Sequence, residues 1–494
     1  MSMNIIQISH TDNVAVALHP VSRGDEIEVG GYAFEALEDI PQGHKIALKH
    51  IKKGQDVIKY GFPIGCALAD VDTGSWVHTH NMTTKLSGVT AYTYNPELHY
   101  PEPEEPELFQ GYRRADGRSA IRNEIWIIPT VGCVNDVAER LAKVNQDLVK
   151  GTIDGLYAFP HPFGCSQTGG DHAQTRKLLA SLVRHPNAAA VLVLGLGCEN
   201  LTQEQFLEEL GDYDPDRVKF LICQEVEDEF AEGRKLLEQC AAYAGRFYRE
   251  PIPVSELVIG MKCGGSDGLS GITANPTVGK FSDMMTARGG STVLTEVPEM
   301  FGAEGFLLNR CVNEKIFEKA VKMLNDFKNY FISHHEVIYD NPSPGNRQGG
   351  ITTLEDKSCG CVQKGGTAPV MDVLDYGDPV TSKGLNMLYG PGNDLVSATA
   401  MTAAGAHIIL FTTGRGTPFG APAPTIKITS NSQLAEHKKA WIDFNAGTVA
   451  EGEAIGDAAK RLMKLVIEVA GGKETCAEMN GFRGISIFKD GVVL

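Results

Sequence analysis

The sequence predicts an α/β protein in which a small N-terminal β-rich domain precedes two α/β domains with mainly parallel sheets. Short strand-like runs separated by turns fill residues 1–97, and the acidic, proline-rich stretch at 98–110 is typical of an extended linker. Beyond the linker, short apolar runs alternate with longer amphipathic stretches, which is the pattern of β–α units. Because 494 residues exceed the size of one core, we expect separate domains at 111–250 and 251–494.

The expected elements follow in chain order from apolar periodicity and from glycine, proline and polar turn residues. In the N-terminal domain, strands are expected at 13–18, 26–29, 45–48 and 56–60. In the first α/β domain, strands are expected at 124–129, 156–159, 191–194 and 219–223, and helices at 135–149, 171–183, 202–210 and 225–245. In the last domain, strands are expected at 257–261, 291–295 and 407–412, helices at 313–331 and 457–470, and a glycine-rich functional loop at 343–367.

Composition excludes several classes of partner. The formal charge of -17 and the pI near 5.3 argue against binding to nucleic acid or an anionic membrane, because both require a basic face. The N-terminus lacks a basic segment followed by an apolar one, and no apolar run reaches the roughly 20 residues of a membrane span. We therefore expect a cytoplasmic protein whose 11 cysteines are reduced thiols.

Four of the expected strands end at a glycine-flanked cysteine: Cys133, Cys165, Cys198 and Cys263. In an open parallel sheet, ligands bind outside the carboxyl ends of the strands, so four thiols at one such edge would form one site if the strands are neighbours. His161 lies in the loop of Cys165, and imidazole and thiolate together suit iron or zinc. The alternative is that these are buried, inert cysteines.

A second group of candidates is a histidine pair, His78 and His80, in an expected strand after Trp76. Residues two apart on a strand face the same side, so both rings could hold one metal ion or one polar substrate. The competing interpretation is a solvent-facing pair.

Polar loops after strands of the last domain supply further candidates. Gly264, Gly265 and Ser266 would let backbone amides approach an anion, and Asp267 could serve as a ligand or base. Arg415 follows the strand at 407–411, where its guanidinium could form a bidentate hydrogen-bonded pair with a carboxylate.

Several other residues have less specific signals. Glu296 and Glu299, after the strand at 291–295, are candidates for acid and base work, or are surface residues. The pair Cys359 and Cys361 matches no usual metal or redox spacing, so we treat it as incidental. The loop that starts at Gly195 lacks the third glycine of a dinucleotide fingerprint, and no phosphate-binding P-loop occurs.

Taken together, the motifs resemble the altronate and galactarate dehydratase family over essentially the whole chain. They are Gly111-Tyr-Arg-Arg-Ala-Asp-Gly117, Pro129-Thr-Val-Gly-Cys133, Val193-Leu-Gly-Leu-Gly-Cys198, Cys263-Gly-Gly-Ser-Asp-Gly268, Thr295-Glu-Val-Pro-Glu299 and Thr413-Gly-Arg-Gly-Thr-Pro418. The resemblance implies that the N-terminal domain is a β-clip SAF domain. It also implies a hydro-lyase that acts on a small sugar acid.

Within the family, two features are similar to the altronate type: the segment His78-Thr-His80-Asn81 and the pair Asp171-His172. The resemblance therefore implies dehydration of D-altronate to 2-dehydro-3-deoxy-D-gluconate with ferrous iron, or manganese, as cofactor. Galactarate or another sugar acid remains an alternative substrate. We also expect a homo-oligomer.

The chemistry of this elimination suggests roles for the candidates. Removing a proton beside a carboxylate requires stabilisation of the developing charge, and the departing hydroxyl needs a Lewis acid or a proton donor. We expect Arg415 and Lys364 to hold the carboxylate, with Gly264, Gly265 and Ser266 beside it. The expected metal ligands come from Cys133, His161, Cys165, Cys198 and Cys263; the expected proton-transfer residues are His78, His80, His172, Glu296 and Asp267. Two alternatives stay open: an iron–sulfur dehydratase, and a sugar-acid sensor without catalysis.

Overall fold

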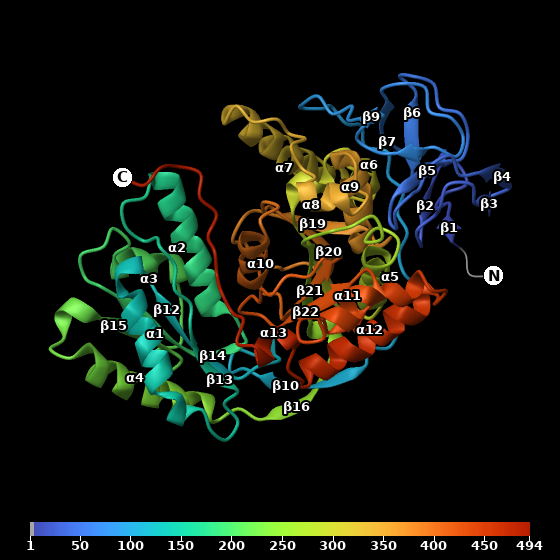
Figure 1. Ribbon diagram of the computed structural model, residues 1–494. Helices are drawn as coiled ribbons and strands as arrows, with labels where there is room; N and C mark the ends of the chain where they lie inside the picture. The colour runs from blue at the N-terminus through green and yellow to red at the C-terminus, as the bar shows by residue number, and fades with distance from the viewer. Residues whose placement is uncertain (1–3) are drawn as a thin grey trace.

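The structure is a computed structural model that describes residues 4–494. Figure 1 shows the N-terminal β domain in blue on one side of a central α/β domain, and a second α/β domain in teal and green on the other side. The C-terminal segment leaves the central domain and runs back along the second domain to end beside helix α2 (Gly169–Arg184). The three domains predicted from the sequence are thus present in the predicted order.

The N-terminal domain consists of short antiparallel strands. One sheet has the order β1-β2-β5-β8, a hairpin pairs β3 with β4, and a third sheet has the order β6-β7-β9. The bounds are β1 Ile5–Ile6, β2 Val14–Ala17, β3 Glu26–Val29, β4 Tyr32–Glu35, β5 Lys45–Ala47, β6 Asp56–Lys59, β7 Phe62–Ala67, β8 Trp76–Val77 and β9 Met82–Thr83. The four predicted strands are confirmed as β2, β3, β5 and β6, and β1, β4, β7 and β9 are additional.

The second domain has a four-stranded parallel sheet of order β13-β12-β14-β15, with helices on both faces. Its elements are β12 Glu124–Pro129, α1 Asn135–Val144, β13 Gly155–Ala158, α2, β14 Ala188–Gly195, α3 Gln203–Leu210, β15 Val218–Ile222 and α4 Glu229–Ala244. All eight residues of β14 are buried because helices cover both faces, which explains its continuous apolar sequence. The alternating strands and helices predicted for this region are confirmed.

The C-terminal domain contains a seven-stranded, all-parallel sheet of order β19-β20-β18-β17-β21-β22-β23. The strands are β17 Val258–Cys263, β18 Ser291–Leu294, β19 Val370–Leu374, β20 Gly384–Leu388, β21 Ile408–Thr413, β22 Thr425–Thr429 and β23 Phe444–Asn445. The helices are α5 Ala274–Ala287, α6 Gly305–Leu308, α7 Glu314–Ser333, α8 Pro344–Gln348, α9 Leu354–Cys361, α10 Asp394–Ala403, α11 Ser432–His437, α12 Ile455–Ala470 and α13 Cys476–Met479. Because β17 and β21 are neighbours, the loops after them meet at the centre of the carboxyl edge.

The structure differs from the predictions in one stretch of the C-terminal domain, in the linker, and in four strands. The stretch 343–367, predicted as a long loop, forms α8 and α9, because Ser343 and Thr353 cap these helices with their hydroxyls. The predicted linker ends early: β10 (Leu108–Arg113) begins inside it and pairs with β16 (Arg249–Pro253). The strands β19, β20, β22 and β23 were not predicted, and β20 and β22 carry the buried polar side chains Asn386 and Lys427.

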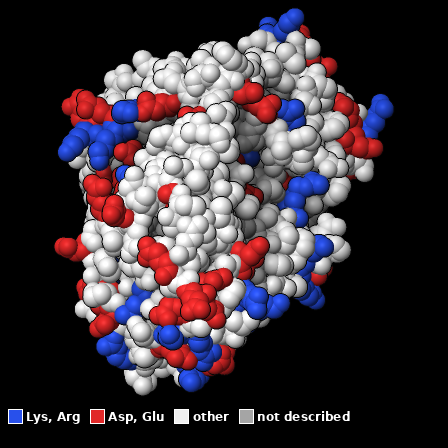
Figure 2. All heavy atoms as spheres, turned by 90° about the vertical axis from the view of Figure 1, so that its left-hand side faces the viewer, with Lys and Arg blue, Asp and Glu red and all other residues white. Residues whose placement is uncertain are grey.

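Buried ion pairs connect the second domain to the end of the chain. Arg122 pairs with Glu478 at 2.8 Å, and Arg483 pairs with Glu124 at 2.9 Å; all four side chains are buried. In the part of the chain described, residues 4–494, no helix has the length and apolar character needed to cross a membrane. Figure 2 shows acidic and basic side chains interspersed on the face formed largely by the second domain.

Buried histidines between the two α/β domains predict a pH dependence of stability. His185 Nε2 lies 3.1 Å from the carbonyl of Ala406, and His407 Nε2 lies 3.0 Å from that of Ser119. Burial lowers the pKa of His407 to about 4 and that of His185 well below its usual value. The unfolded chain, with pKa near 6.5, takes up these protons first, so the free energy of unfolding should fall as pH decreases from about 6.5 to 4.

Urea unfolding at a series of pH values measures this effect. His407→Gln should unfold more easily at pH 7 but lose part of the slope below pH 6.5, whereas the exposed control His10→Gln should keep the native slope. An unchanged slope in His407→Gln would show that this ring does not contribute.

Candidate active site

A cleft opens where the N-terminal domain meets the carboxyl edge of the seven-stranded sheet. Its volume is about 850 Å³. Its polar lining includes Gln42, Asp267, Gln348, Arg415, Asn431 and His437. The loops after β17 and β21 and helix α8 supply one wall, and the turn before β5 supplies the other. The cleft therefore lies where parallel sheets bind ligands.

Arg415 is the exposed cation of this cleft, on the loop that follows β21. Its guanidinium donates to the carbonyl of Gly345 at 3.3 Å and to Gln348 Oε1 at 3.2 Å. Both partners come from α8, so this helix fixes the direction of the side chain. A guanidinium held in this way keeps further N–H donors that could pair with a carboxylate, and that role of Arg415 stays a prediction.

Asp267 also lines the cleft, but neighbouring donors occupy both of its carboxylate oxygens. Ser270 N and Ser430 Oγ donate to Oδ1 at 2.9 Å and 2.8 Å, and Asn431 Nδ2 donates to Oδ2 at 3.2 Å. A carboxylate with this many donors holds the loops after β17 and β22 together. This arrangement favours a positioning role over the predicted role as a base.

The glycines of the loop after β17 let other chain segments approach closely. A Cβ at Gly264 would lie 2.6 Å from Asp394 Oδ2, and Gly265 has a φ of +66°, which favours glycine. A Cβ at Gly268 would lie 1.9 Å from the carbonyl oxygen of Gly43, so the N-terminal domain contacts this loop through backbone. Within residues 4–494, the buried Ser266 Oγ has no hydrogen-bond partner.

Three histidines and a tryptophan of the N-terminal domain form a stack beside the cleft. The ring centroids of Trp76 and His78 are 5.4 Å apart and nearly parallel, those of His44 and His78 are 4.9 Å apart, and those of Trp76 and His80 are 5.4 Å apart. The predicted strand is shorter than expected: β8 ends at Val77, and both His78 and His80 lie in the following turn. They nevertheless contact the same tryptophan ring.

His78 is the member of this stack best suited to proton transfer. Burial and then the charge of Lys45 lower the pKa of His78 to about 4, so the ring is neutral at pH 7. Its Nδ1 lies 3.4 Å from Thr352 Oγ1, which leaves Nε2 for another partner. His44, by contrast, uses both nitrogens, since Trp76 Nε1 donates to Nδ1 and Nε2 lies 3.1 Å from the carbonyl of Gln348.

A buried ion triad fixes the N-terminal domain against α9. Lys45 Nζ and Lys59 Nζ contact the two oxygens of Asp356 at 2.7 Å and 3.0 Å, and none of the three side chains is more than 2% exposed. Lys45 also donates to Thr352 Oγ1 at 2.6 Å. The triad therefore sets the position of His78 relative to the C-terminal domain.

Behind the cleft, Lys262 and Glu296 form a buried ion pair. Lys262 Nζ contacts Glu296 Oε1 at 2.9 Å and Asp394 Oδ1 at 2.6 Å. Burial raises the pKa of Glu296, although the charge of Lys262 opposes this shift. Glu296 has a φ of +68°, a strained conformation for this residue, and its Oε2 accepts from the backbone N of Cys263 at 2.8 Å. The strain and burial indicate a functional position, but one closed off from the cleft.

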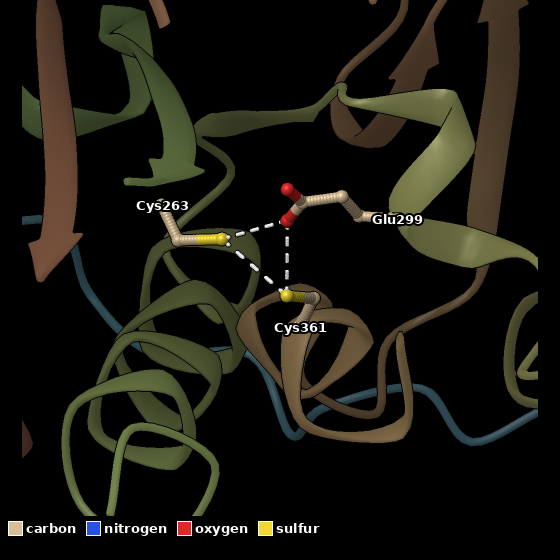
Figure 3. Close-up of side chains that lie close together, drawn as sticks. All are labelled: Cys263, Glu299 and Cys361. Atoms are coloured by element: carbon tan, nitrogen blue, oxygen red, sulfur yellow. Dashed lines mark hydrogen bonds between the residues drawn. The ribbon is translucent and has the colours of Figure 1, made fainter. Parts of the chain in front are cut away.

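Next to this pair, Cys263, Glu299 and Cys361 converge from β17, a 3-10 turn and the end of α9 (Figure 3). Glu299 Oε2 lies 3.0 Å from Cys263 Sγ and 3.1 Å from Cys361 Sγ, and the two sulfurs are 3.4 Å apart. Within residues 4–494, no other His, Cys, Asp or Glu side chains gather so closely in a group of three or more. These are the residues that could hold a metal ion.

Two lysines compensate the carboxylate of this group. Lys357 Nζ contacts Glu299 Oε1 at 2.8 Å, and Lys364 Nζ lies 3.7 Å from Glu296 Oε2. Burial alone would raise the pKa of Glu299, but the charges of Lys357 and Lys364 lower it to about 2. Glu299 is therefore ionised. Lys364 is only 1% exposed and does not line the cleft, whereas Arg415 does. The structure therefore does not bring the two together as the predicted carboxylate-binding pair.

The predicted five-residue metal site is not assembled as expected. Cys133, Cys165 and Cys198 do follow three adjacent strands, β12, β13 and β14, but Cys263 ends β17 in the other sheet, so the prediction of one shared edge is wrong for Cys263. Cys133 and Cys198 are exposed, and Cys165 is half-buried. No ligand group is found among them in the described residues.

The two predicted histidines of the second domain do not reach the cleft residues either. His161 Nε2 lies 2.7 Å from the carbonyl of Pro129, and its Nδ1 accepts from Phe163 N at 3.2 Å. Because the backbone occupies both nitrogens, His161 shapes its loop and is not available as a ligand. His172 lies on α2 in the same domain and is not among the residues that line the cleft.

Sequence reasoning missed several residues of the site. His44 directly follows a turn, Gln348 ends the short helix α8, Cys361 belongs to a pair treated as incidental, and Lys262 lies in an otherwise apolar strand. Lys262 carried the one usable signal, because a charge within a buried strand requires a buried partner.

This edge of the sheet can bind a carboxylate and move protons beside it, which is what a hydro-lyase acting on hydroxy acids requires. Family comparison is consistent with that class. Residues 3–85 match the altronate/galactarate dehydratase SAF domain, 111–245 the second domain of D-galactarate dehydratase/altronate hydrolase, and 254–493 the C-terminal domain of D-galactarate/altronate dehydratase. The chain belongs to the altronate/galactarate dehydratase family.

Relatives narrow the comparison further. The chain is 52% identical to altronate dehydratase of Escherichia coli K12, with 100% of each chain covered, and 50% identical to altronate dehydratase of Bacillus subtilis 168, with 99% of this chain and 100% of the relative covered. It is 34% identical to the L-threo-forming galactarate dehydratase of Escherichia coli K12, over 95% of this chain and 93% of the relative.

Proposed function

We propose that this protein catalyses the dehydration of D-altronate to 2-dehydro-3-deoxy-D-gluconate. The observation that carries the proposal is the full-length identity of 52% and 50% to two altronate dehydratases, against 34% to a galactarate dehydratase. The cleft supports it, because Arg415 lines the cleft and can bind a carboxylate. The neutral His78, a possible proton acceptor, packs against His44, whose Nε2 lies 3.1 Å from the carbonyl of Gln348 in the cleft lining.

In the proposed reaction, the C2–H and C3–O bonds break, a C2=C3 bond forms and water leaves; the resulting enol then becomes the 2-keto acid. Arg415 binds the carboxylate and stabilises the charge that develops on it. His78 accepts the C2 proton through Nε2, while Lys45 and Thr352 hold its ring in place. The N-terminal domain covers the cleft and limits access of water.

The proposal includes a divalent metal cofactor, ferrous iron or manganese. Cys263, Glu299 and Cys361, whose ligand atoms all lie within 4.8 Å of one another, would hold it. When bound, such an ion supplies Lewis-acid assistance to the departing hydroxyl or the carboxylate. A cytoplasmic location and a homo-oligomeric assembly remain predictions, which cell fractionation and light scattering would measure.

A coupled assay for 2-keto-3-deoxy acids tests the function. Protein purified without oxygen and supplied with ferrous iron should form the keto acid from D-altronate. It should turn over galactarate at least ~10-fold more slowly, because some polar groups of a site that matches altronate stay unpaired when a different sugar acid binds. Faster turnover of galactarate would assign the second family activity, and binding of altronate without any keto product would leave only a sensor.

A further inference from the structure

We propose that Cys133, Cys165 and Cys198 hold an iron–sulfur cluster of the four-iron, four-sulfide class in the second domain. These cysteines follow β12, β13 and β14, which are neighbours in one parallel sheet, so all three lie at its carboxyl edge (Figure 1). The residues that line the large cleft all come from the N-terminal and C-terminal domains. The proposed cluster is therefore separate from the divalent ion of the proposed function and does not rest on that function.

Hydrogen bonds join the three cysteine loops to one another. There is one bond for each pair of loops: Gly132 N to the carbonyl of Phe163 at 2.9 Å, Leu201 N to the carbonyl of Gly164 at 3.0 Å, and Thr130 Oγ1 to Glu199 Oε1 at 3.0 Å. Asn200 adds a further contact, since its Oδ1 accepts from Ser166 N at 2.8 Å and from Cys165 Sγ at 3.2 Å. The fold itself thus brings the three loops together.

The residue before each of the three cysteines is a glycine, which permits this close packing. A Cβ at Gly164 would lie 1.9 Å from the carbonyl oxygen of Thr130, in the loop of Cys133. A Cβ at Gly197 would lie 2.9 Å from Gln224 Oε1. Both glycines also have positive φ values, +99° and +124°, which favour glycine. The Gly-Cys pairs therefore place thiols where backbone from a neighbouring loop comes closest.

Sulfur atoms are the ligands that this edge of the sheet leaves available. Both nitrogens of His161 contact backbone groups. The carboxylate of Glu199 accepts from one hydroxyl and from two backbone N–H groups. The three thiols, by contrast, are free, and those of Cys133 and Cys198 are exposed. Thiolate ligands alone suit iron–sulfur clusters, zinc or cuprous ions.

The spacing of the thiols favours a cluster over a single ion. A single-ion site has its ligand atoms within 4.8 Å of one another, and within residues 4–494 the three thiols do not form such a group. Neighbouring strands lie ~4.8 Å apart, so thiols that follow three adjacent strands are spread more widely. A cluster matches this spread, because each thiolate binds a different iron atom. Three thiolates would leave the fourth iron to an exchangeable ligand.

Binding of an assembled cluster involves no oxidation or reduction. Each thiol loses its proton and forms one iron–sulfur bond, including Cys165, whose proton is donated to Asn200 in the free protein. Gln224 supports the thiolate of Cys198, since its Nε2 donates to Sγ at 3.4 Å. Hydrogen bonds to the sulfurs help to set the reduction potential of a cluster. This bond should raise the potential, because it stabilises the more negative, reduced state.

Cys223 also lies at this edge, directly after β15, but is less suited to bind the cluster. Burial raises the pKa of Cys223 to about 11, so its thiol stays protonated at neutral pH. We therefore leave Cys223 out of the ligand set. Its position makes it a matched control.

Analysis of sulfide in protein purified without oxygen, from cells grown with added iron, tests the proposal. The full-length protein should be brown, should contain about four acid-labile sulfides per chain, and should have a visible absorption that chemical reduction bleaches. Loss of an outer-shell partner already costs ~10–100-fold in metal affinity, so Cys133→Ala, Cys165→Ala and Cys198→Ala should each lower bound sulfide ~10-fold or more. Gln224→Leu should keep the sulfide but shift the midpoint potential to a more negative value.

Cys223→Ala should keep the native sulfide content. Cys361→Ala, in the C-terminal domain, should also keep it, because it lies outside the proposed cluster site. Circular dichroism checks that each variant is folded, and the potential of Gln224→Leu decides the matter if a cysteine variant is not. An anaerobic protein without sulfide, native sulfide in any of the three cysteine variants, loss of sulfide in Cys223→Ala, or an unchanged potential in Gln224→Leu would overturn the inference. Because no substrate enters these measurements, their failure is separate from a failure to dehydrate altronate.

Discussion

Replacing Arg415 with alanine is expected to lower kcat/KM for D-altronate by about 100-fold while leaving the protein folded. The side chain is exposed in the cleft, so its loss leaves no buried charge. A charge-assisted hydrogen bond to a carboxylate contributes ~1.5–3 kcal/mol, which corresponds to roughly 10- to 150-fold in rate or binding. Steady-state kinetics on a range of altronate concentrations measures the change.

Two further variants sharpen this prediction. Arg415→Lys keeps the charge but not the planar fork, and its activity should be intermediate. Arg347 of α8 is also an exposed arginine, but it does not line the cleft, so Arg347→Ala should change kcat/KM little. Full activity in Arg415→Ala would place the carboxylate of the substrate elsewhere.

Replacing Asp356 with asparagine is expected to cause the largest loss of stability. Asp356 is the common partner of Lys45 and Lys59, and all three side chains are buried. Removing one member of a buried ion group leaves uncompensated charge and costs ~3–5 kcal/mol. The N-terminal domain should detach first, so the midpoint of the earliest urea transition should fall and activity should be lost with it.

The exposed carboxylate Asp72, which contacts His50, provides the control: Asp72→Asn should change the unfolding free energy by less than ~1 kcal/mol. The triple variant Lys45→Met, Lys59→Met, Asp356→Leu removes all three charges and should recover most of the lost stability. If Asp356→Asn unfolds like the native protein, the triad does not hold the two domains together.

Local sequence predicts the fold class well, because both α/β domains have strands and helices with clear periodicity. It also identifies the loops of Asp267 and Arg415, since each directly follows a strand that ends at the carboxyl edge of the sheet. It does not reveal which sheet a strand joins. The strand before Cys263 resembles those before Cys133, Cys165 and Cys198, yet it belongs to the seven-stranded sheet.

Long-range contacts explain the rest of the differences. Lys45 and Asp356 are 311 residues apart, and Cys263 and Cys361 are 98 residues apart, so nothing near either residue announces its partner. In α9, Cys361 lies in the group with Cys263 and Glu299 whereas Cys359 does not. The two residues therefore do not act as a pair, in agreement with a spacing that matches no usual metal or redox motif. The prediction that both are incidental overlooked the long-range partners of Cys361.

The elimination can be observed directly by NMR of the product formed from D-altronate in deuterium oxide. The account predicts 2-dehydro-3-deoxy-D-gluconate that carries one solvent deuteron at C3, because the enol left by loss of the C2 proton and the C3 hydroxyl is protonated there by solvent. Absence of this keto acid, or a product without deuterium at C3, would contradict the proposed dehydration.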